Sequence, residues 1–252
     1  MARLMKQVPK KSGVAITDTG ALIDRGSLAV VETQWQLPAP PTFIRHFQQH
    51  AYVIAKSVLP ERTCSVWRAQ AVRLWREYGR TINKPGRPGG TELRYEVVTG
   101  EDVEKRWPEM FSFYCAPDLH AWIKAITGAD DISRSKHLQS AININVLSKP
   151  GEVYPWHFDA VPYTLILYLS DSSPKQGGAL EIRAKRTHGL ERPVAYLPRS
   201  GDLLLMDGTR CYHRITPLRQ AHVRISIPMV FPKSIEHSRS LDLDSFLYDR
   251  AA

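Results

Sequence analysis

The stretch Tyr154-Pro-Trp-His-Phe-Asp159 places a histidine and an aspartate two positions apart. On a β-strand, side chains at i and i+2 leave from the same face, so His157 and Asp159 can reach one metal ion together. The pair alone is weak evidence, because 9 histidines and 25 acidic residues in a chain of 252 produce about one such spacing by chance. A third ligand and an independent feature are needed.

A third candidate ligand, His213, follows the segment Gly201-Asp-Leu-Leu-Leu-Met-Asp-Gly208 at the start of another predicted strand. Two imidazoles and one carboxylate form the facial triad that holds Fe(II) and leaves adjacent positions open for a chelating acid and O₂. Each histidine alone could equally be a residue satisfied by backbone hydrogen bonds. The combination of spacings therefore carries the prediction that His157, Asp159 and His213 bind iron.

The last predicted strand supplies a cation. Its apolar residues alternate, which places Arg224 and Ser226 together on the opposite face. An arginine fork and a hydroxyl can bind one carboxylate of a dicarboxylic acid. In residues 142–146, Asn143 and Asn145 share a face in the same way, and we expect their amides to line the same cavity.

Short strands separated by turn residues dominate the chain from Leu138 onward, which predicts a sandwich or barrel with the earlier helices packed outside it. The expected fold class is α+β. Strands are expected over 141–148, 152–159, 163–170, 178–183, 193–197, 202–206, 211–216 and 222–231.

The first half is predicted to contain a strand over residues 51–59 and a helix that reaches about residue 78. A second helix, around residues 119–126, is expected to end at Gly128, because glycine favours helix C-termini.

Residues 1–42 are predicted to form a partly mobile arm, since they begin basic and end in a proline cluster. Residues 43–252 are predicted to form one domain with its core over about 138–231. The glycine- and proline-rich segment 84–90 reads as a loop, either a candidate lid or a plain connector.

The chain carries 34 basic and 25 acidic residues, a formal net charge of +9. Residues 1–100 hold 15 basic and 7 acidic residues, whereas residues 101–252 hold 19 and 18. The surplus therefore lies away from the predicted ligands. We interpret it as a docking region for an anionic substrate or carrier, in preference to nucleic acid.

Three separated cysteines, Cys64, Cys115 and Cys211, do not form the patterns of a disulfide framework or a zinc site. The N-terminus lacks the apolar run of a secretory signal, and no apolar stretch is long enough to cross a bilayer. We expect a cytoplasmic protein without a membrane partner. The common nucleotide-loop, serine-hydrolase and zinc-protease motifs are absent.

Together these features resemble the Fe(II)/2-oxoglutarate-dependent oxygenases, whose pattern is H-x-D, a distal histidine, and an arginine or lysine shortly after it. The segments Tyr163 to Asp171, Gly177-Gly178 and Gly201-Asp202 resemble the prolyl-4-hydroxylase-like branch. The resemblance covers about residues 138–231 and implies a double-stranded β-helix, the jelly-roll or cupin-like core.

The resemblance also implies site residues and cofactors. Iron would bind His157, Asp159 and His213, while 2-oxoglutarate chelates it and is held at its distal carboxylate by Arg224 and Ser226. Further cosubstrate contacts are expected from Tyr154, Asn145 and Thr164. Substrate contacts are expected from Trp156, Arg94 and Tyr95, with aromatic core packing as the alternative for Trp156.

The implied reaction uses O₂, decarboxylates 2-oxoglutarate to succinate and CO₂, and oxidises a C–H bond of the substrate, by default to an alcohol. In the halogenating branch a glycine or alanine replaces the carboxylate ligand to admit chloride. Asp159 therefore favours hydroxylation or a related oxidation over halogenation.

We expect a small-molecule substrate, such as an amino-acid-like compound or a natural-product intermediate, free or carrier-bound. The first alternative is a protein-residue hydroxylase of the prolyl type. A nucleic-acid demethylase is disfavoured, because Val230 stands where that branch has a second arginine. A non-catalytic cupin-like binding module is the third alternative, and the oligomeric state is left open.

Overall fold

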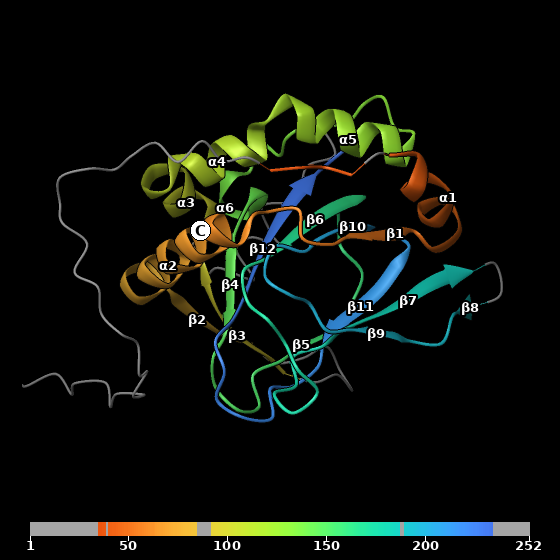
Figure 1. Ribbon diagram of the computed structural model, residues 1–252. Helices are drawn as coiled ribbons and strands as arrows, with labels where there is room; N and C mark the ends of the chain where they lie inside the picture. The colour runs from red at the N-terminus through yellow and green to blue at the C-terminus, as the bar shows by residue number, and fades with distance from the viewer. Residues whose placement is uncertain (1–34, 39, 85–91, 187–188, 234–252) are drawn as a thin grey trace, which may run out of the picture. The chain divides into compact units, whose positions relative to one another are not determined.

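The computed structural model describes residues 35–38, 40–84, 92–186 and 189–233. Within them the chain forms six helices and twelve strands (Figure 1). The helices are α1 (Pro41–His50), α2 (Glu61–Tyr78), α3 (Gly100–Arg106), α4 (Pro108–Cys115), α5 (Pro117–Thr127) and α6 (Leu138–Ala141).

Seven antiparallel strands form the larger sheet, in the order β1-β10-β6-β12-β4-β3-β2. Their bounds are β1 (Tyr52–Ala55), β2 (Arg80–Lys84), β3 (Leu93–Val98), β4 (Ile144–Leu147), β6 (Tyr163–Tyr168), β10 (Leu203–Asp207) and β12 (Arg224–Phe231). Strands far apart in sequence are therefore neighbours.

Five antiparallel strands form the smaller sheet, in the order β5-β11-β7-β8, with β9 also paired to β7. Their bounds are β5 (Tyr154–His157), β7 (Leu180–Arg186), β8 (Gly189–Leu190), β9 (Val194–Tyr196) and β11 (Cys211–Ile215). The strand β5 is an edge strand of this path.

Helices cover one face of the larger sheet (Figure 1). Ile225, Ile227 and Met229 of β12 are fully buried in the main apolar cluster, which also takes buried residues from α2, α4 and α5. Burial of this helix-facing layer is the main stabilising force on the domain, because apolar area removed from water contributes about 25 cal/mol per Å².

The opposite face of the larger sheet meets the smaller sheet. Tyr168 of β6 packs in one apolar cluster with Leu180, Ile182 and Cys211 of β7 and β11. We call the space between the two sheets the interior. Because strand residues alternate, Thr164, Ile166 and Tyr168 face the interior, while the intervening leucines face the helices.

The eight strands predicted from Leu138 onward are all present, with their ends trimmed by one to three residues at most positions. The predicted strand at 51–59 is present as β1, although it ends at Ala55. Two strands of the first half, β2 and β3, were not predicted, and they join β1 in the larger sheet. The β2 segment Arg-Thr-Ile-Asn-Lys is mostly exposed, so it lacks the apolar run that marked the others.

The two predicted helices are present as α2 and α5, and α5 ends at Gly128 in the left-handed conformation. Most of the predicted arm and of segment 84–90 lies outside the described residues. The proline cluster does not exclude regular structure, because α1 begins at Pro41, in the first turn, where a missing N–H costs nothing. No helix among the described residues is both long and apolar enough to cross a bilayer.

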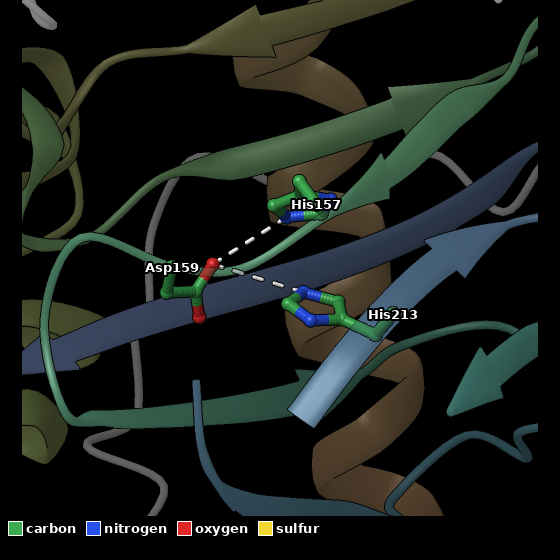
Figure 2. Close-up of side chains that lie close together, drawn as sticks. All are labelled: His157, Asp159 and His213. Carbon is green, nitrogen blue, oxygen red and sulfur yellow. Dashed lines mark ion pairs between the residues drawn. The ribbon is translucent and has the colours of Figure 1, made fainter. Parts of the chain in front are cut away.

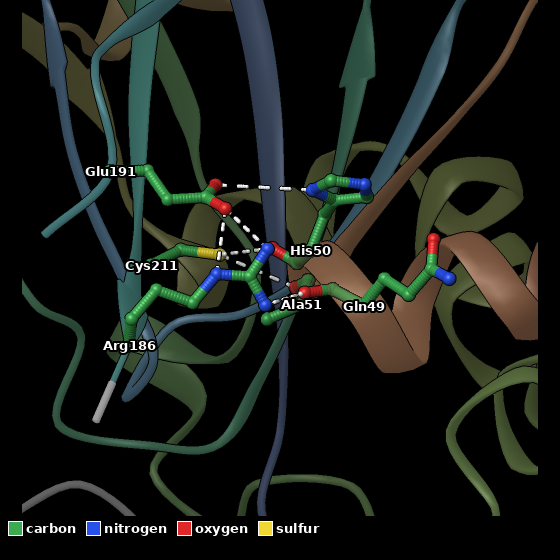
Figure 3. Close-up of polar contacts among 6 residues, drawn as sticks. All are labelled: Gln49, His50, Ala51, Arg186, Glu191 and Cys211. Atoms are coloured by element: carbon green, nitrogen blue, oxygen red, sulfur yellow. Dashed lines mark hydrogen bonds and ion pairs between the residues drawn. The ribbon is translucent and has the colours of Figure 1, made fainter. Parts of the chain in front are cut away.

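A polar cluster ties α1 to the smaller sheet (Figure 3). Arg186 of β7 donates to the Gln49 carbonyl at 2.6 Å and pairs with Glu191. The Cys211 thiol, at the start of β11, contacts the Ala51 carbonyl at 3.3 Å. These contacts fix the beginning of β11, the strand that carries His213.

Candidate active site

Three side chains converge where β5 and β11 face the interior (Figure 2). His157, Asp159 and His213 each offer one ligand atom, and these atoms all lie within 4.8 Å of one another. The Asp159 Oδ1 atom lies 3.4 Å from His157 Nε2 and 3.7 Å from His213 Nε2. Among the described residues this is the group whose donor atoms could hold a metal ion together.

The strand register explains why two ligands distant in sequence meet. His157 of β5 and His213 of β11 are directly paired across the smaller sheet, and their rings lie 4.0 Å apart. The register shifts between His213 and Ile215, so that Tyr154 also faces the interior beside His157, with ring centroids 4.6 Å apart. Side chains paired across a sheet share a face, which brings both imidazoles to one point.

Backbone contacts orient both imidazoles. The Nδ1–H of His157 donates to the Pro155 carbonyl at 2.9 Å, and that of His213 donates to the Cys211 carbonyl at 3.0 Å. A carbonyl can only accept, so each Nδ1 carries the proton and each Nε2 presents its lone pair. Such outer contacts are typical of metal-binding histidines.

The protonation states also suit a divalent cation. Burial, aided by the nearby His157, lowers the pKa of His213 to about 4 against the opposing pull of Asp159, so this imidazole is neutral at neutral pH. For Asp159, burial favours the neutral acid, but the two histidines and the Thr164 hydroxyl outweigh it and hold the pKa well below its usual range. Neutral imidazoles and an ionised carboxylate are the ligand forms that metals require.

Arg224 is the second chemical feature of the interior. Its side chain is buried, with 1% of the residue exposed, and forms no ion pair with a carboxylate of the described residues. The Nε–H donates to the Gly178 carbonyl at 2.8 Å and an Nη1–H donates to Ser226 Oγ at 3.2 Å. A guanidinium has five N–H donors, so donors are left for an anion.

Other buried polar atoms surround this guanidinium. Tyr168 and Asn145 are the register partners of Ser226 on the two neighbouring strands. Among the described residues, the buried Asn145 Oδ1 atom has no hydrogen-bond partner, while the buried Tyr168 hydroxyl interacts with Arg224. Burial raises the pKa of Tyr168 to about 12 even though Arg224, whose guanidinium carbon lies 5.4 Å from the ring centroid, opposes that rise.

The predicted residues divide between the two features. Thr164 donates a hydrogen bond of 2.6 Å to Asp159 Oδ2, which places it beside the metal triad. Tyr154 lies beside His157, and the buried ring of Tyr95 lies 5.2 Å from that of Tyr154. Ser226 and Asn145 lie beside Arg224.

Trp156 and Arg94 lie elsewhere. The Trp156 ring stacks on Tyr212 at 5.1 Å, and Arg214 lies over it at 4.9 Å, on the side of the smaller sheet opposite His157 and His213. Arg94 is exposed, pairs with Glu92 at 3.7 Å, and leaves β3 from the face opposite Tyr95. These placements do not support the expected substrate contacts for Trp156 and Arg94, because strand alternation turns both side chains away from the interior.

Sequence reasoning missed two residues of the Arg224 region. Tyr168 could have been found from the two-residue period of β6, which gives it the same face as Thr164. Gly178 has φ +68, and a Cβ there would lie 2.9 Å from Arg224 Cδ, so this position needs glycine to let the arginine approach its carbonyl.

The residues present fit an iron ion and a dicarboxylate. The triad supplies two nitrogen donors and one oxygen donor, which matches the ligand set of non-haem Fe(II) sites. A buried guanidinium without an anionic partner is costly, and a carboxylate would neutralise it. Both features face the same interior.

Comparison with known proteins gives one family and many similar folds. Residues 40–246 match the family described as HalD, Halogenase D. No curated protein matches the sequence.

The solved structures that are similar share the fold at low sequence identity. The epimerase SnoN from nogalamycin biosynthesis, described as non-haem and α-ketoglutarate-dependent, is 15% identical with a TM-score of 0.60, covering 76% of this chain and 81% of its own. A Pseudomonas putida prolyl-4-hydroxylase is 17% identical, with a TM-score of 0.55 and coverage of 80% and 100%. HygX from Streptomyces hygroscopicus, solved with nickel, 2-oxoglutarate and hygromycin B, is 15% identical, with a TM-score of 0.54 and coverage of 76% and 86%. The expected double-stranded β-helix is confirmed.

Proposed function

Because the chain belongs to the halogenase D family and has the fold of the 2-oxoglutarate-dependent oxygenases, we propose that it is an Fe(II)/2-oxoglutarate-dependent oxygenase acting on a small molecule. The observation that carries this proposal is the pairing of a three-residue cation site with a buried arginine that has no carboxylate partner among the described residues. A single ligand that chelates the metal at one end and carries a carboxylate at the other would bind both the cation site and the arginine.

His157, Asp159 and His213 would hold the iron, which supplies oxygen activation coupled to decarboxylation of 2-oxoglutarate to succinate and CO₂. Arg224 would bind the distal carboxylate with its remaining N–H donors, and Ser226 would orient that guanidinium. Asn145 and Tyr168 would offer further polar contacts to the cosubstrate. These side chains would bind and orient the cosubstrate. Because Arg224 is buried, the distal carboxylate of 2-oxoglutarate would be shielded from water there.

We propose that the reaction is hydroxylation or a related oxidation. The family carries the name of a halogenase, whereas in this chain Asp159 fills the carboxylate position of the triad. A halide would need a coordination position that this carboxylate occupies. The proposal is tested by mass spectrometry of products formed in chloride and in bromide buffers, and a halogenated product would contradict it.

The substrate would be an amino-acid-like compound or a natural-product intermediate, free or carrier-bound. Two similar structures carry descriptions that name natural products, nogalamycin biosynthesis and hygromycin B. In this chain, Tyr154 and Tyr95 extend an aromatic wall away from His157, which would contact such a substrate. The described cysteines are free, which suits a biosynthetic enzyme of the reducing cytoplasm.

The test is anaerobic addition of Fe(II) and then 2-oxoglutarate to the metal-free protein, with visible absorption recorded. We expect a charge-transfer band that requires both additions and is lost in His157→Ala. Candidate substrates that enter the site would perturb the band. If the wild-type protein binds iron without forming the band, the 2-oxoglutarate assignment fails.

A further inference from the structure

The two carboxylate oxygens of Asp159 have different surroundings. Oδ1 faces the Nε2 atoms of both histidines, at 3.4 and 3.7 Å. Oδ2 accepts a hydrogen bond of 2.6 Å from the Thr164 hydroxyl. The carboxylate is therefore turned so that one oxygen faces both imidazoles and the other accepts a hydrogen bond from Thr164.

Gly208 closes the space around the second oxygen. A Cβ at Gly208 would lie 2.4 Å from Asp159 Oδ2 and 2.4 Å from Asp159 Cβ, so any side chain there would displace the carboxylate. The Asp159 N–H donates to the Gly208 carbonyl at 3.0 Å, and the Gly208 N–H donates to the Pro162 carbonyl at 2.8 Å. Two backbone hydrogen bonds thus fix Gly208 against the loop that carries Asp159.

Thr164 belongs to the larger sheet and Gly208 directly follows one of its strands, whereas the two histidines belong to the smaller sheet and Asp159 lies just after its strand β5. Thr164 lies on β6 and pairs with Met206 of β10, and Gly208 directly follows β10. The same sheet carries Arg224 on β12, which also pairs with β6. A contact from this sheet to Asp159 therefore fixes the metal ligand relative to the arginine.

We propose that Thr164 and Gly208 form a carboxylate clamp, a pair of positioning residues that keeps Asp159 a one-oxygen ligand with Oδ1 toward the ion. This inference rests on the proposed function. If Oδ2 were free to coordinate as well, it would occupy one of the positions that a chelating cosubstrate and O₂ need. Thr164, which the sequence suggested as a cosubstrate contact, is thereby assigned to the metal ligand instead.

The test uses Co(II) as a spectroscopic probe, because its visible d–d bands report coordination number without turnover. Metal-free wild type, Thr164→Val and Thr164→Ser are titrated with Co(II), with and without 2-oxoglutarate. We expect Thr164→Val to weaken Co(II) binding by about 10-fold to 100-fold and to change the band intensities, the range seen when an outer contact to a metal ligand is removed. Thr164→Ser restores both, since it keeps the hydroxyl.

The chain offers a matched control one residue beyond the clamp. Thr209 donates a hydrogen bond of 2.6 Å to Asp207 Oδ1 and is exposed. Thr209→Val removes an equivalent threonine–aspartate contact that touches no ligand, so its Co(II) titration should match the wild type. Gly208→Ala should act in the direction of Thr164→Val, and melting of each metal-free variant separates ligand displacement from misfolding.

Two results overturn the clamp. If wild type binds Co(II) and 2-oxoglutarate but Thr164→Val has the same affinity and spectrum, the clamp is wrong while the proposed function stands. If wild type shows no Co(II) binding that depends on His157, both the proposed function and the clamp fail. Should Gly208→Ala not fold, the Val and Ser variants at position 164 decide the matter.

Discussion

The metal triad and the region around Arg224 both face the interior, yet their polar atoms are satisfied to different degrees. Around the triad every outer atom has a partner, because each Nδ1 is bonded to a carbonyl and Asp159 Oδ2 is bonded to Thr164. Around Arg224, the described part of the chain supplies neither a carboxylate for the buried charge nor a hydrogen-bond partner for Asn145 Oδ1. The side chains of the first region are already held in place for a cation, whereas the second region lacks an anion from the described residues to pair with Arg224.

This difference indicates how the two ligands would affect stability. In the unliganded protein, hydrogen bonds already hold the three side chains of the triad. A bound metal would therefore not have to compensate for an unsatisfied buried group. A buried, unpaired guanidinium costs free energy in the unliganded protein, and an anion relieves that cost. We therefore expect 2-oxoglutarate to stabilise the fold through Arg224, and the following variants test that contrast.

The largest effect is expected from His157→Ala, which removes a metal ligand. Iron affinity and 2-oxoglutarate turnover should fall by more than about 100-fold, beyond the cost of losing an outer contact to a ligand. The measurement is iron content together with succinate formation. His46→Ala, at an exposed histidine of α1, is the control and should leave both unchanged.

Removing the cation of the second region comes next. Arg224→Met should weaken 2-oxoglutarate binding by about 2–5 kcal/mol, the cost of truncating one partner of a buried charge pair. The same variant should raise the melting temperature of the unliganded protein, since an unpaired buried charge is removed. Calorimetric titration and thermal melting measure the two effects.

The exposed Arg219, which donates to the Pro174 carbonyl, supplies the control as Arg219→Ala. A destabilised unliganded Arg224→Met protein with normal 2-oxoglutarate affinity would mean that the arginine is structural, and the contrast between the two regions would be lost.

Gly178→Ala should have an intermediate effect. Its left-handed φ costs a residue with a Cβ about 1–2 kcal/mol, and the new methyl would press on Arg224 Cδ. We expect lower stability and weaker 2-oxoglutarate binding, measured by melting and titration. Gly128→Ala is a close control, because Gly128 has φ +69 but an added Cβ there would have no described atom within 4 Å, so the variant should lose stability without losing affinity.

The smallest effect on the site is expected from Trp156→Ala. The variant loses stacking on Tyr212, worth about 0.5–1.5 kcal/mol, but its ring lies on the side of the sheet away from the triad. Stability should fall modestly while the half-saturating 2-oxoglutarate concentration stays the same. A large change in substrate affinity would show that the outer side of β5 also contributes to the site.

Local sequence patterns were sufficient to predict part of the site. The two-residue period of β12 predicted that Arg224 and Ser226 share a face, and the structure places both in the interior, joined by a hydrogen bond. The same period, applied to Trp156, should have placed it opposite His157, but its position in the motif suggested a substrate contact. For β2 and β3 the sequence offered weak signals, because a polar strand such as Arg80–Lys84 is defined by its partner.

The sequence by itself determined the ligand types, their order and the face on which each lies, because these follow from residue chemistry and strand alternation. The tertiary structure decided which distant strands became neighbours. That pairing brought His213 opposite His157, set Thr164 and Gly208 against Asp159, and enclosed Arg224 without a carboxylate partner among the described residues. Such contacts depend on register and burial between segments far apart in the chain, which no local pattern encodes.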